Sequence, residues 1–468
     1  MTNRSPRGSR RRMRWMSAIA AGVAIPLALV GCTSPDAPSN VPEGEVGGTL
    51  NMWIAGLDSI DDASVSAYED VYMKPFQKLY PNVTFNSQPQ NDEGIKQKIL
   101  TALAAGQGPD IIDALSSSDA IPFAQAGYLE DLGPLAEQEN WKDTIFPWAM
   151  DVGVVDGKLV ALPVNFETLV LFYNKTLFEE NGWTPPTNRE ELETLAGDME
   201  AKGITPFTNA NADYVGATEH VLSSFLNMVA GPAKMHDALT GDIKWTDPAF
   251  VDSVELMTDY FDNGWFSGGV KQYFSTTDPV KYGDLVNGKA AMFMSGSWEI
   301  GALNDYFDGS GQEWDWAPLP SLDPRVAEGV YPLSIGATIA INSASQNKPA
   351  AEAYVKWRLT NADDRWTAIK EFGDLPLPVK FDASTAPADI DPRFIAQYEA
   401  LSDASIAEKV GYVTWTSLGA GAEAYVLENE DKLLTHDLSA KDFLKGVDDA
   451  FQKDLDKGLI PPVYDTKG

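Results

Sequence analysis

Cysteine and histidine are scarce in this sequence of 468 residues. The only cysteine is Cys32, and the three histidines, His220, His236 and His436, lie far apart along the chain. An internal disulfide and a cysteine-based metal site are therefore excluded, and the histidines lack the close spacing typical of metal ligands. The sequence also contains neither a P-loop nor a G-x-S-x-G pattern. We expect no metal, no cofactor and no catalytic residue.

Basic residues are also few. The formal net charge is −33, although residues 1–31 hold six of the 35 basic residues and no acidic one. The rest of the chain has 29 basic and 68 acidic residues, a net charge of −39. Such an acidic surface repels nucleic acid and anionic lipid, so neither is an expected partner. The hydrophobic fraction of 44% is typical of a globular protein, and the length suggests two domains or lobes.

Residues 1–31 have the pattern of an export signal. A basic stretch is followed by an apolar run from Trp15 to Val30, which is short for a bilayer span. The sequence Leu29-Val30-Gly31-Cys32 then resembles a bacterial lipobox, in which the cysteine becomes the lipidated first residue of the mature chain. We therefore expect lipidation of Cys32, removal of residues 1–31, and a flexible tether over residues 32–48.

The next part of the chain alternates between strand-like and helical patterns. Strand-like runs cover residues 49–54, 83–85 and 109–112, and apolar residues at helical spacing cover about 64–79 and 95–103. Alternation in this order predicts an α/β fold with a mostly parallel sheet flanked by helices.

One later stretch carries two candidate binding residues. Residues 290–294 form an apolar run bounded by glycines, which predicts a strand buried on both faces. Trp298 and Glu299 follow the end of this strand, where ligands bind in open α/β sheets. The alternatives are that Trp298 packs in the core and that Glu299 is an acid in the first turn of a helix.

An acid and a glycine stand out in apolar surroundings. Glu167 is the lone acid of an apolar segment, where a carboxylate needs a partner or a ligand to offset its desolvation. Residues 333–341 predict one long strand with Gly336 in mid-course. A glycine there suggests that another strand or a ligand approaches the backbone closely.

Four motifs together resemble a known family. In chain order they are Gly108-Pro109-Asp110-Ile111-Ile112, Asp156-Gly157-Lys158 running on to Tyr173-Asn174-Lys175, Gly288-Lys289-Ala290-Ala291-Met292 with Gly296-Ser297-Trp298, and Ser334-Ile335-Gly336-Ala337 with Ile341-Asn342. With these motifs the chain resembles the extracellular solute-binding proteins of ATP-driven importers. It is most similar to the family of maltose-binding protein and other sugar-binding lipoproteins.

The resemblance implies a two-lobed, periplasmic-binding-protein-like α/β fold with a central ligand cleft. One lobe would comprise residues 48–158 and 334–378, and the other residues 159–333 and 379–468. It also implies a monomer, anchored by its lipid at the extracellular face of the cell membrane, that binds a sugar and delivers it to the permease of the transporter. A binding role of this kind requires no catalysis.

The resemblance further implies a set of ligand-binding residues. Ser116 and Ser117 fall where the family often has a polar or charged pair, Glu167 matches a sugar-binding acid, Trp298 a stacking indole and Gly336 a strand on the hinge side. The remaining implied positions are Trp53, Asp58, Asp213, Tyr214 and Trp415. Glu299 is a further candidate binding residue because of its place after the strand. Which sugar is bound, and of what length and linkage, does not follow from these residues.

Two other functions stay open. The candidate contact loops, residues 111–119, 163–168, 294–300 and 332–338, contain no Arg, Lys or His, which favours a neutral or a cationic ligand. A polyamine or quaternary amine is therefore the alternative within the binding class, since acids and tryptophans can form an anionic aromatic cage. A glycoside hydrolase, which needs two carboxyl groups at a fixed separation, is the alternative among enzymes.

Overall fold

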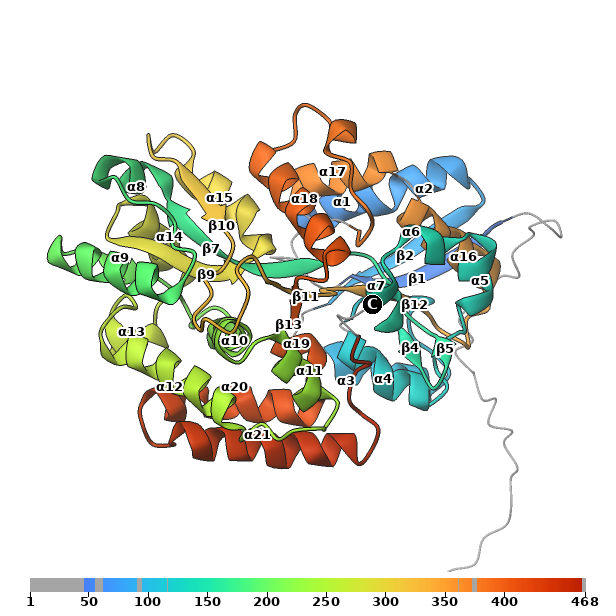
Figure 1. Ribbon diagram of the computed structural model, residues 1–468. Coiled ribbons are helices and arrows are strands. Elements are labelled where there is room, and N and C mark those ends of the chain that lie inside the picture. The colour runs from blue at the N-terminus through green and yellow to red at the C-terminus, as the bar shows by residue number, and fades with distance from the viewer. Residues whose placement is uncertain are drawn as a thin grey trace, which may run out of the picture. The chain divides into compact units, whose positions relative to one another are not determined.

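The computed structural model describes residues 46–54, 62–90, 95–115, 117–360, 362–372 and 377–464 (Figure 1). All of these residues fall within one structural unit, Val41–Gly468. The predicted signal segment, Cys32 and most of the predicted tether lie outside the described residues. Within the described part, no helix combines the length and the apolar character that crossing a membrane requires.

The first sheet has five strands in the order β2-β1-β3-β12-β6. β1 pairs in parallel with β2 and β3, whereas β12 runs antiparallel to β3 and β6. The parallel sheet predicted for the first part of the chain is thus confirmed. Its strands are β1 (Gly48–Ile54), β2 (Val83–Pro89), β3 (Ile111–Leu115), β6 (Leu162–Pro163) and β12 (Thr338–Ile341).

Helices and one hairpin accompany this sheet. The helices are α1 (Asp62–Tyr72), α2 (Lys74–Leu79), α3 (Ile95–Ala104), α4 (Ser117–Gln125), α5 (Gly133–Gln138), α6 (Trp141–Thr144), α7 (Pro147–Asp151), α16 (Lys348–Thr360) and α17 (Ala362–Phe372). The hairpin joins β4 (Val154–Val155) to β5 (Lys158–Leu159) through Asp156 and Gly157, whose φ angles are 50° and 76°. Both residue types tolerate positive φ, which explains the turn at this position.

The second sheet has six strands in the order β13-β11-β7-β9-β8, with β10 also paired to β7. β9 is buried along its whole length, which confirms the strand predicted from the apolar run. The strands are β7 (Glu167–Asn174), β8 (Thr205–Phe207), β9 (Ala290–Gly296), β10 (Trp314–Ala317), β11 (Tyr331–Ser334) and β13 (Val410–Tyr412).

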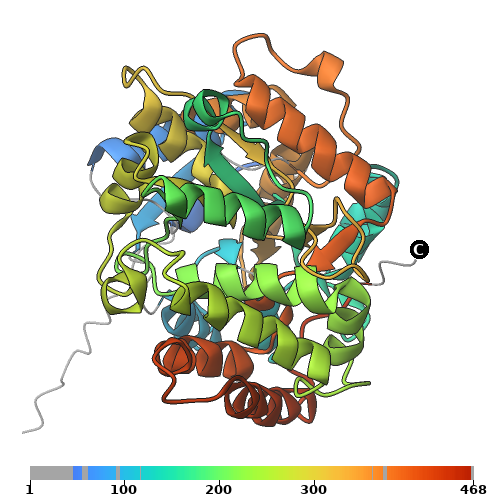
Figure 2. The same cartoon turned by 60° about the vertical axis from the view of Figure 1, so that its left-hand side comes forward.

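The second sheet is accompanied by a larger set of helices. Two of them, α20 and α21, pack against each other and against α12 (Figure 1 and Figure 2). The set comprises α8 (Lys175–Asn181), α9 (Arg189–Ala201), α10 (Ala217–Phe225), η1 (Leu226–Ala230), α11 (Pro232–Leu239), α12 (Pro248–Asp262), α13 (Gly269–Tyr273), α14 (Asp278–Val286), η2 (Ser297–Glu299), α15 (Ile300–Phe307), η3 (Ala383–Thr385), α18 (Pro392–Ile406), α19 (Thr414–Ser417), α20 (Ala420–Leu434) and α21 (Ala440–Leu455).

Two short segments carry the chain from one sheet to the other. The chain leaves β6 of the first sheet at Pro163, enters β7 of the second at Glu167, and returns from β11 to β12 through residues 335–337. The two segments are bonded together, because Val164 N donates to Ala337 O (3.1 Å) and Ala337 N donates to Asn165 Oδ1 (2.8 Å). The single strand predicted over residues 333–341 is therefore wrong: it is two strands that belong to different sheets.

The end of the described chain contacts residues of both sequence halves. Tyr464 is buried, and its hydroxyl lies 2.6 Å from Gly411 O, which follows the start of β13. Its ring stacks on Tyr412 at 4.6 Å and lies 5.1 Å from the ring of Trp148 in α7. Tyr412 is the last residue of β13.

Candidate functional site

Glu167 stands where the chain enters the second sheet, as the first residue of β7. It is 8% exposed, and its Oε1 accepts hydrogen bonds from Ser334 Oγ (2.7 Å) and from Trp415 Nε1 (3.3 Å). Burial raises the pKa of Glu167 above its ordinary value, while these two hydrogen bonds act in the opposite direction. Among the described residues no cationic side chain pairs with this carboxylate, so its charge is compensated by hydrogen bonds alone.

Gly336 gives the Glu167 side chain its room. A Cβ added at residue 336 would lie 2.5 Å from Glu167 Oε2, closer than side chains approach one another. The predicted close approach to this glycine is therefore present, and the carboxylate of Glu167, the first residue of β7, makes it. The requirement for glycine is steric, because its backbone is not among those with positive φ.

Trp298 and Trp415 form a half-buried pair of indoles beside Glu167. Trp298 lies in η2, directly after β9, and a Cβ added at Gly296 would meet its ring at 2.1 Å. Trp415 lies in α19, and the two ring centroids are 6.0 Å apart with an interplanar angle of 80°. Because Trp415 also donates to Glu167, the structure brings three of the predicted binding residues together.

His220 packs against both indoles. Its ring centroid is 4.9 Å from that of Trp298 and 4.8 Å from that of Trp415. Burial lowers the pKa of His220 to about 4, with smaller and opposing effects of Glu299 and Lys281, so the imidazole is neutral at neutral pH. The sequence offered no local signal for this residue, because α10 also carries Thr218, Glu219, Ser223 and Ser224. Spacing between histidines was the wrong criterion.

Two further predicted residues, Asp213 and Tyr214, lie on the loop before α10. The side chain of Tyr214 is 56% exposed, and its ring centroid is 5.6 Å from that of His220, which places it at the rim of the aromatic group. Asp213 Oδ2 instead accepts from the backbone N–H of Asp278, the first residue of α14 (2.8 Å). We therefore assign Asp213 to capping this helix.

Glu299 is fully engaged by protein groups. Its carboxylate forms an ion pair with Lys281 (3.1 Å) and accepts from the hydroxyls of Ser295 and Tyr282. Burial would raise the pKa of Glu299, but Lys281 and these hydrogen bonds hold it below its ordinary value. With both oxygens bonded to protein groups, Glu299 holds the turn that carries Trp298. Its predicted contact with a ligand stays a prediction.

The remaining predicted positions are Trp53, Asp58, Ser116 and Ser117. Trp53, near the end of β1, is half-buried, and Lys98 Nζ lies 5.0 Å from its ring centroid. Ser117 begins α4, which is in contact with α19, the helix of Trp415. The side chain of Ser117, and all of Asp58 and Ser116, lie outside the described residues. Their predicted contacts stay predictions.

Two buried acids lie close to this site without contributing to it. Glu219, next to His220 on α10, and Glu430 on α20 are 2% and 3% exposed. Burial, together with neighbouring carboxylates, raises the pKa of Glu219 to about 8 and that of Glu430 to about 9. One oxygen of each is fully enclosed and has no hydrogen-bond partner among the described residues. The described residues contain no group of acids, histidines and cysteines suited to hold a metal ion.

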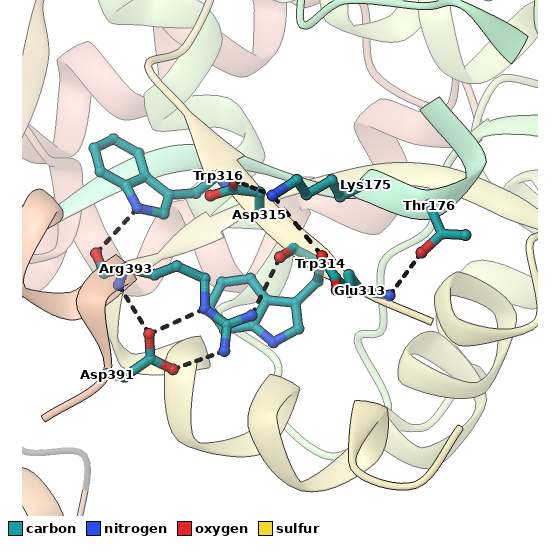
Figure 3. A network of polar contacts seen from close by, with 8 residues as sticks. All are labelled: Lys175, Thr176, Glu313, Trp314, Asp315, Trp316, Asp391 and Arg393. Atoms are coloured by element: carbon teal, nitrogen blue, oxygen red, sulfur yellow. Dashed lines mark hydrogen bonds and ion pairs between the residues drawn. The ribbon is translucent and has the colours of Figure 1, made fainter. Parts of the chain in front are cut away.

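A second aromatic and polar cluster joins β10 to the start of α18 (Figure 3). The guanidinium of Arg393 lies 3.8 Å from the ring centroid of Trp314 and pairs with Asp391 (2.7 Å). Trp316 Nε1 donates to Arg393 O (3.1 Å), and Lys175 pairs with Asp315 (3.7 Å). These contacts attach a helix to the sheet, and the cluster is separate from the Glu167 site.

Comparisons with known proteins bear on what this site does. Residues 61–365 match the model of the bacterial extracellular solute-binding protein family. The chain is 24% identical over 302 residues to a maltotriose-binding protein of Pyrococcus abyssi, covering 63% of this chain and 59% of the relative. It is 26% identical over 288 residues to a diacetylchitobiose binding protein of Streptomyces coelicolor, covering 58% and 60%. Each alignment spans less than two thirds of the relative's own length.

A solved structure shows the same fold. The chain superimposes on a chitin oligosaccharide binding protein with a TM-score of 0.72 and 21% identity, covering 87% of this chain and 98% of that one. This match confirms the predicted periplasmic-binding-protein-like α/β fold.

Proposed function

The chain belongs to the bacterial extracellular solute-binding protein family, and we propose that it captures a neutral carbohydrate, a di- or oligosaccharide, for an ATP-driven importer and delivers it to the membrane permease. As a member of a family of binding proteins it is not an enzyme, so the glycoside hydrolase alternative is set aside. The ligands for which the maltotriose-binding and diacetylchitobiose binding relatives are named support a carbohydrate ligand.

The observation that carries this proposal is the pairing of the Glu167 carboxylate with two indoles. Glu167 Oε1 is bonded to Ser334 and Trp415, whereas no hydrogen bond to Oε2 is found among the described residues. A carboxylate oxygen accepts hydrogen bonds from sugar hydroxyls, and indole faces cover the apolar C–H faces of a sugar ring. Glu167 with Trp298 and Trp415 supplies both kinds of contact within one small region.

The placement of the site supports binding between two lobes. Glu167 and Gly336 lie on the two segments that pass between the sheets, and α4 of the first part contacts α19 of the second. We propose that residues 48–158 with 334–378 form one lobe, and that residues 159–333 with 379–468 form the other. Ligand binding would then shift the population from an open to a closed arrangement of the lobes.

The proposed location rests on the sequence before the described residues. Residues 1–31 have the pattern of an export signal, and Cys32 stands where lipidation occurs. A monomer anchored through Cys32 at the extracellular face of the membrane, on a tether of residues 32–48, would stay close to its permease. Mass spectrometry of the membrane fraction tests this: a lipid on Cys32 is expected, and a Cys32→Ser variant should be released from the membrane.

A thermal-shift screen against sugars, followed by calorimetry, tests the ligand class. A ligand that binds only the native state raises the melting temperature. At a ligand concentration of 100 times Kd it adds about 2.7 kcal/mol to the free energy of unfolding. We expect a shift with at least one oligosaccharide, for instance maltotriose or diacetylchitobiose, and little change in affinity between low and high salt.

The polyamine alternative is the competing outcome of the same screen. The buried Glu167 carboxylate without a cationic partner is the feature that a cationic ligand would also complement. Spermidine and choline therefore belong in the screen. A shift with one of these cations that disappears at high salt, with none from any sugar, would replace the carbohydrate assignment.

A further inference from the structure

We infer that His220 is a ligand-binding residue of this site, which hydrogen-bonds the bound sugar beside Trp298 and Trp415. This inference rests on the proposed sugar-binding function. It concerns a side chain that neither the motifs nor the resemblance pointed to.

The first observation is the position of the imidazole. Its ring centroid lies within 5.6 Å of those of Trp298, Trp415 and Tyr214, and Trp415 bonds in turn to Glu167. His220 is therefore the ring that all three other aromatic side chains share. A sugar that contacts the indoles and reaches Glu167 has to pass close to this ring.

The second observation is what the imidazole lacks. Although His220 is only 8% exposed, no hydrogen bond to either ring nitrogen is found among the described residues. Neither nitrogen is among the fully enclosed polar atoms without a partner, so the nitrogens keep some of the little accessible surface of the residue. Buried polar groups in native proteins are almost always bonded, so a nearly buried imidazole without a protein partner indicates a ligand or a water molecule that a ligand displaces.

The third observation is the charge state. The depressed pKa, about 4, keeps the imidazole neutral under physiological conditions, with one nitrogen as a donor and the other as an acceptor. A hydroxyl or an acetamido group both donates and accepts, so a neutral imidazole matches it in either tautomer. A protonated His220 imidazole would instead favour an anionic ligand, and no other feature of the site favours an anion.

The alternative is that His220 only fills space beside the indoles. His220→Phe separates the two roles, because phenylalanine keeps a planar ring of similar size and removes both nitrogens. We expect this variant to bind the sugar roughly tenfold more weakly, the upper range for one hydrogen bond, with a melting temperature close to that of the wild type. The probe is whichever of maltotriose and diacetylchitobiose gives the larger thermal shift with the wild type.

A nuclear magnetic resonance measurement reads the hydrogen bond directly. The chain has only three histidines, so His236→Gln and His436→Gln identify the His220 imidazole nitrogen signals by elimination, on protein purified without a histidine tag. Addition of the sugar should shift the His220 nitrogen signals and leave those of His236 and His436 unchanged. These two residues contact Asp237 and Asp262, away from the indole pair, and serve as internal controls.

The outcomes separate cleanly. A shift of the His220 signals together with weaker binding by His220→Phe supports the inference, and absence of either one overturns it. If His220→Phe does not fold, the wild-type signals decide alone. If the wild type binds neither sugar nor any other carbohydrate, the proposed function itself fails before His220 is tested.

Discussion

The Glu167 carboxylate lies directly against the α-carbon of Gly336. The two residues lie on the two segments that join the sheets, and no additional atom fits between them. A Cβ at residue 336 would lie 2.5 Å from Oε2 and 2.7 Å from the carboxyl carbon. The same carboxylate is fixed by Ser334 two residues earlier. One stretch of backbone therefore both holds Glu167 and limits where it can move.

Gly336→Ala tests this relationship. The added methyl group must displace the Glu167 carboxylate, which breaks its bonds to Ser334 and Trp415, and overpacking of this kind costs about 1–3 kcal/mol. We expect a lower melting temperature and at least tenfold weaker sugar binding by calorimetry. Gly301→Ala in α15 is the matched control, because nothing lies within 4 Å of a Cβ there, and it should be neutral or slightly stabilising. If Gly336→Ala and Gly301→Ala had the same melting temperature and the same affinity for the sugar, the contact between Gly336 and Glu167 would not be important.

Glu167→Gln tests the role of the charge. Burial raises the pKa of Glu167, so the carboxylate takes up a proton at a higher pH than an ordinary glutamate does. Sugar hydroxyls donate better to the ionised form, and the wild-type affinity should therefore fall as the pH is lowered from 8 to 5. The glutamine variant should bind more weakly at pH 8 and vary little with pH. Titration calorimetry over this range checks both, and parallel pH profiles for the two proteins would contradict the prediction.

Trp298→Ala tests the contribution of the indole. The ring is half-buried and contacts His220 and Trp415, both of which have other partners, so we expect the melting temperature to change by only a few degrees. Sugar binding should become too weak to measure, because a stacking face is lost. Trp183→Ala removes a half-buried indole that packs on Phe178, away from the site, and should leave the affinity unchanged. An intact affinity in Trp298→Ala would remove this residue from the binding site.

The Glu219 and Glu430 pair predicts how stability depends on pH. In the folded chain their pKa values are raised to about 8 and about 9, above those of the unfolded chain. Their contribution to the free energy of unfolding is therefore fully present below the unfolded pKa, and it is lost as the pH rises through the folded values. The melting temperature should fall between pH 6 and pH 9.

The double variant Glu219→Gln and Glu430→Gln isolates this effect. With no charge to form in the buried position, its melting temperature should decline less over the same range and exceed that of the wild type at pH 9. The side chain of Glu313 is 73% exposed, so the Glu313→Gln variant is the control for the loss of an acid. Identical pH profiles for the double variant and the wild type would show that folding does not raise the pKa values of this pair.

The sequence predicted those features that depend on local pattern. The apolar run of β9 is flanked by glycines, so this strand was visible in a few residues. Glu167 was visible for the same reason, since a lone acid in an apolar segment is a local anomaly. The parallel sheet followed from the order of strands and helices.

The features that were missed depend on partners far away in the chain. The apolar residues of 333–341 continue through the crossing, so no local signal marks the change of sheet at Ile335. Glu299 looked available because Lys281, which neutralises it, lies on the preceding helix and meets it only after folding. His220 looked isolated because the indoles around it come from η2 and α19.

Tyr214 offers a practical use of this geometry. Its side chain is largely exposed while its ring lies beside the buried imidazole, and residues 33–468 contain no cysteine. A Tyr214→Cys variant that begins at Thr33 would therefore carry a single thiol, to which an environment-sensitive dye could be attached at the edge of the aromatic group. Such a conjugate would turn the protein into an optical sensor for whatever solute its host collects.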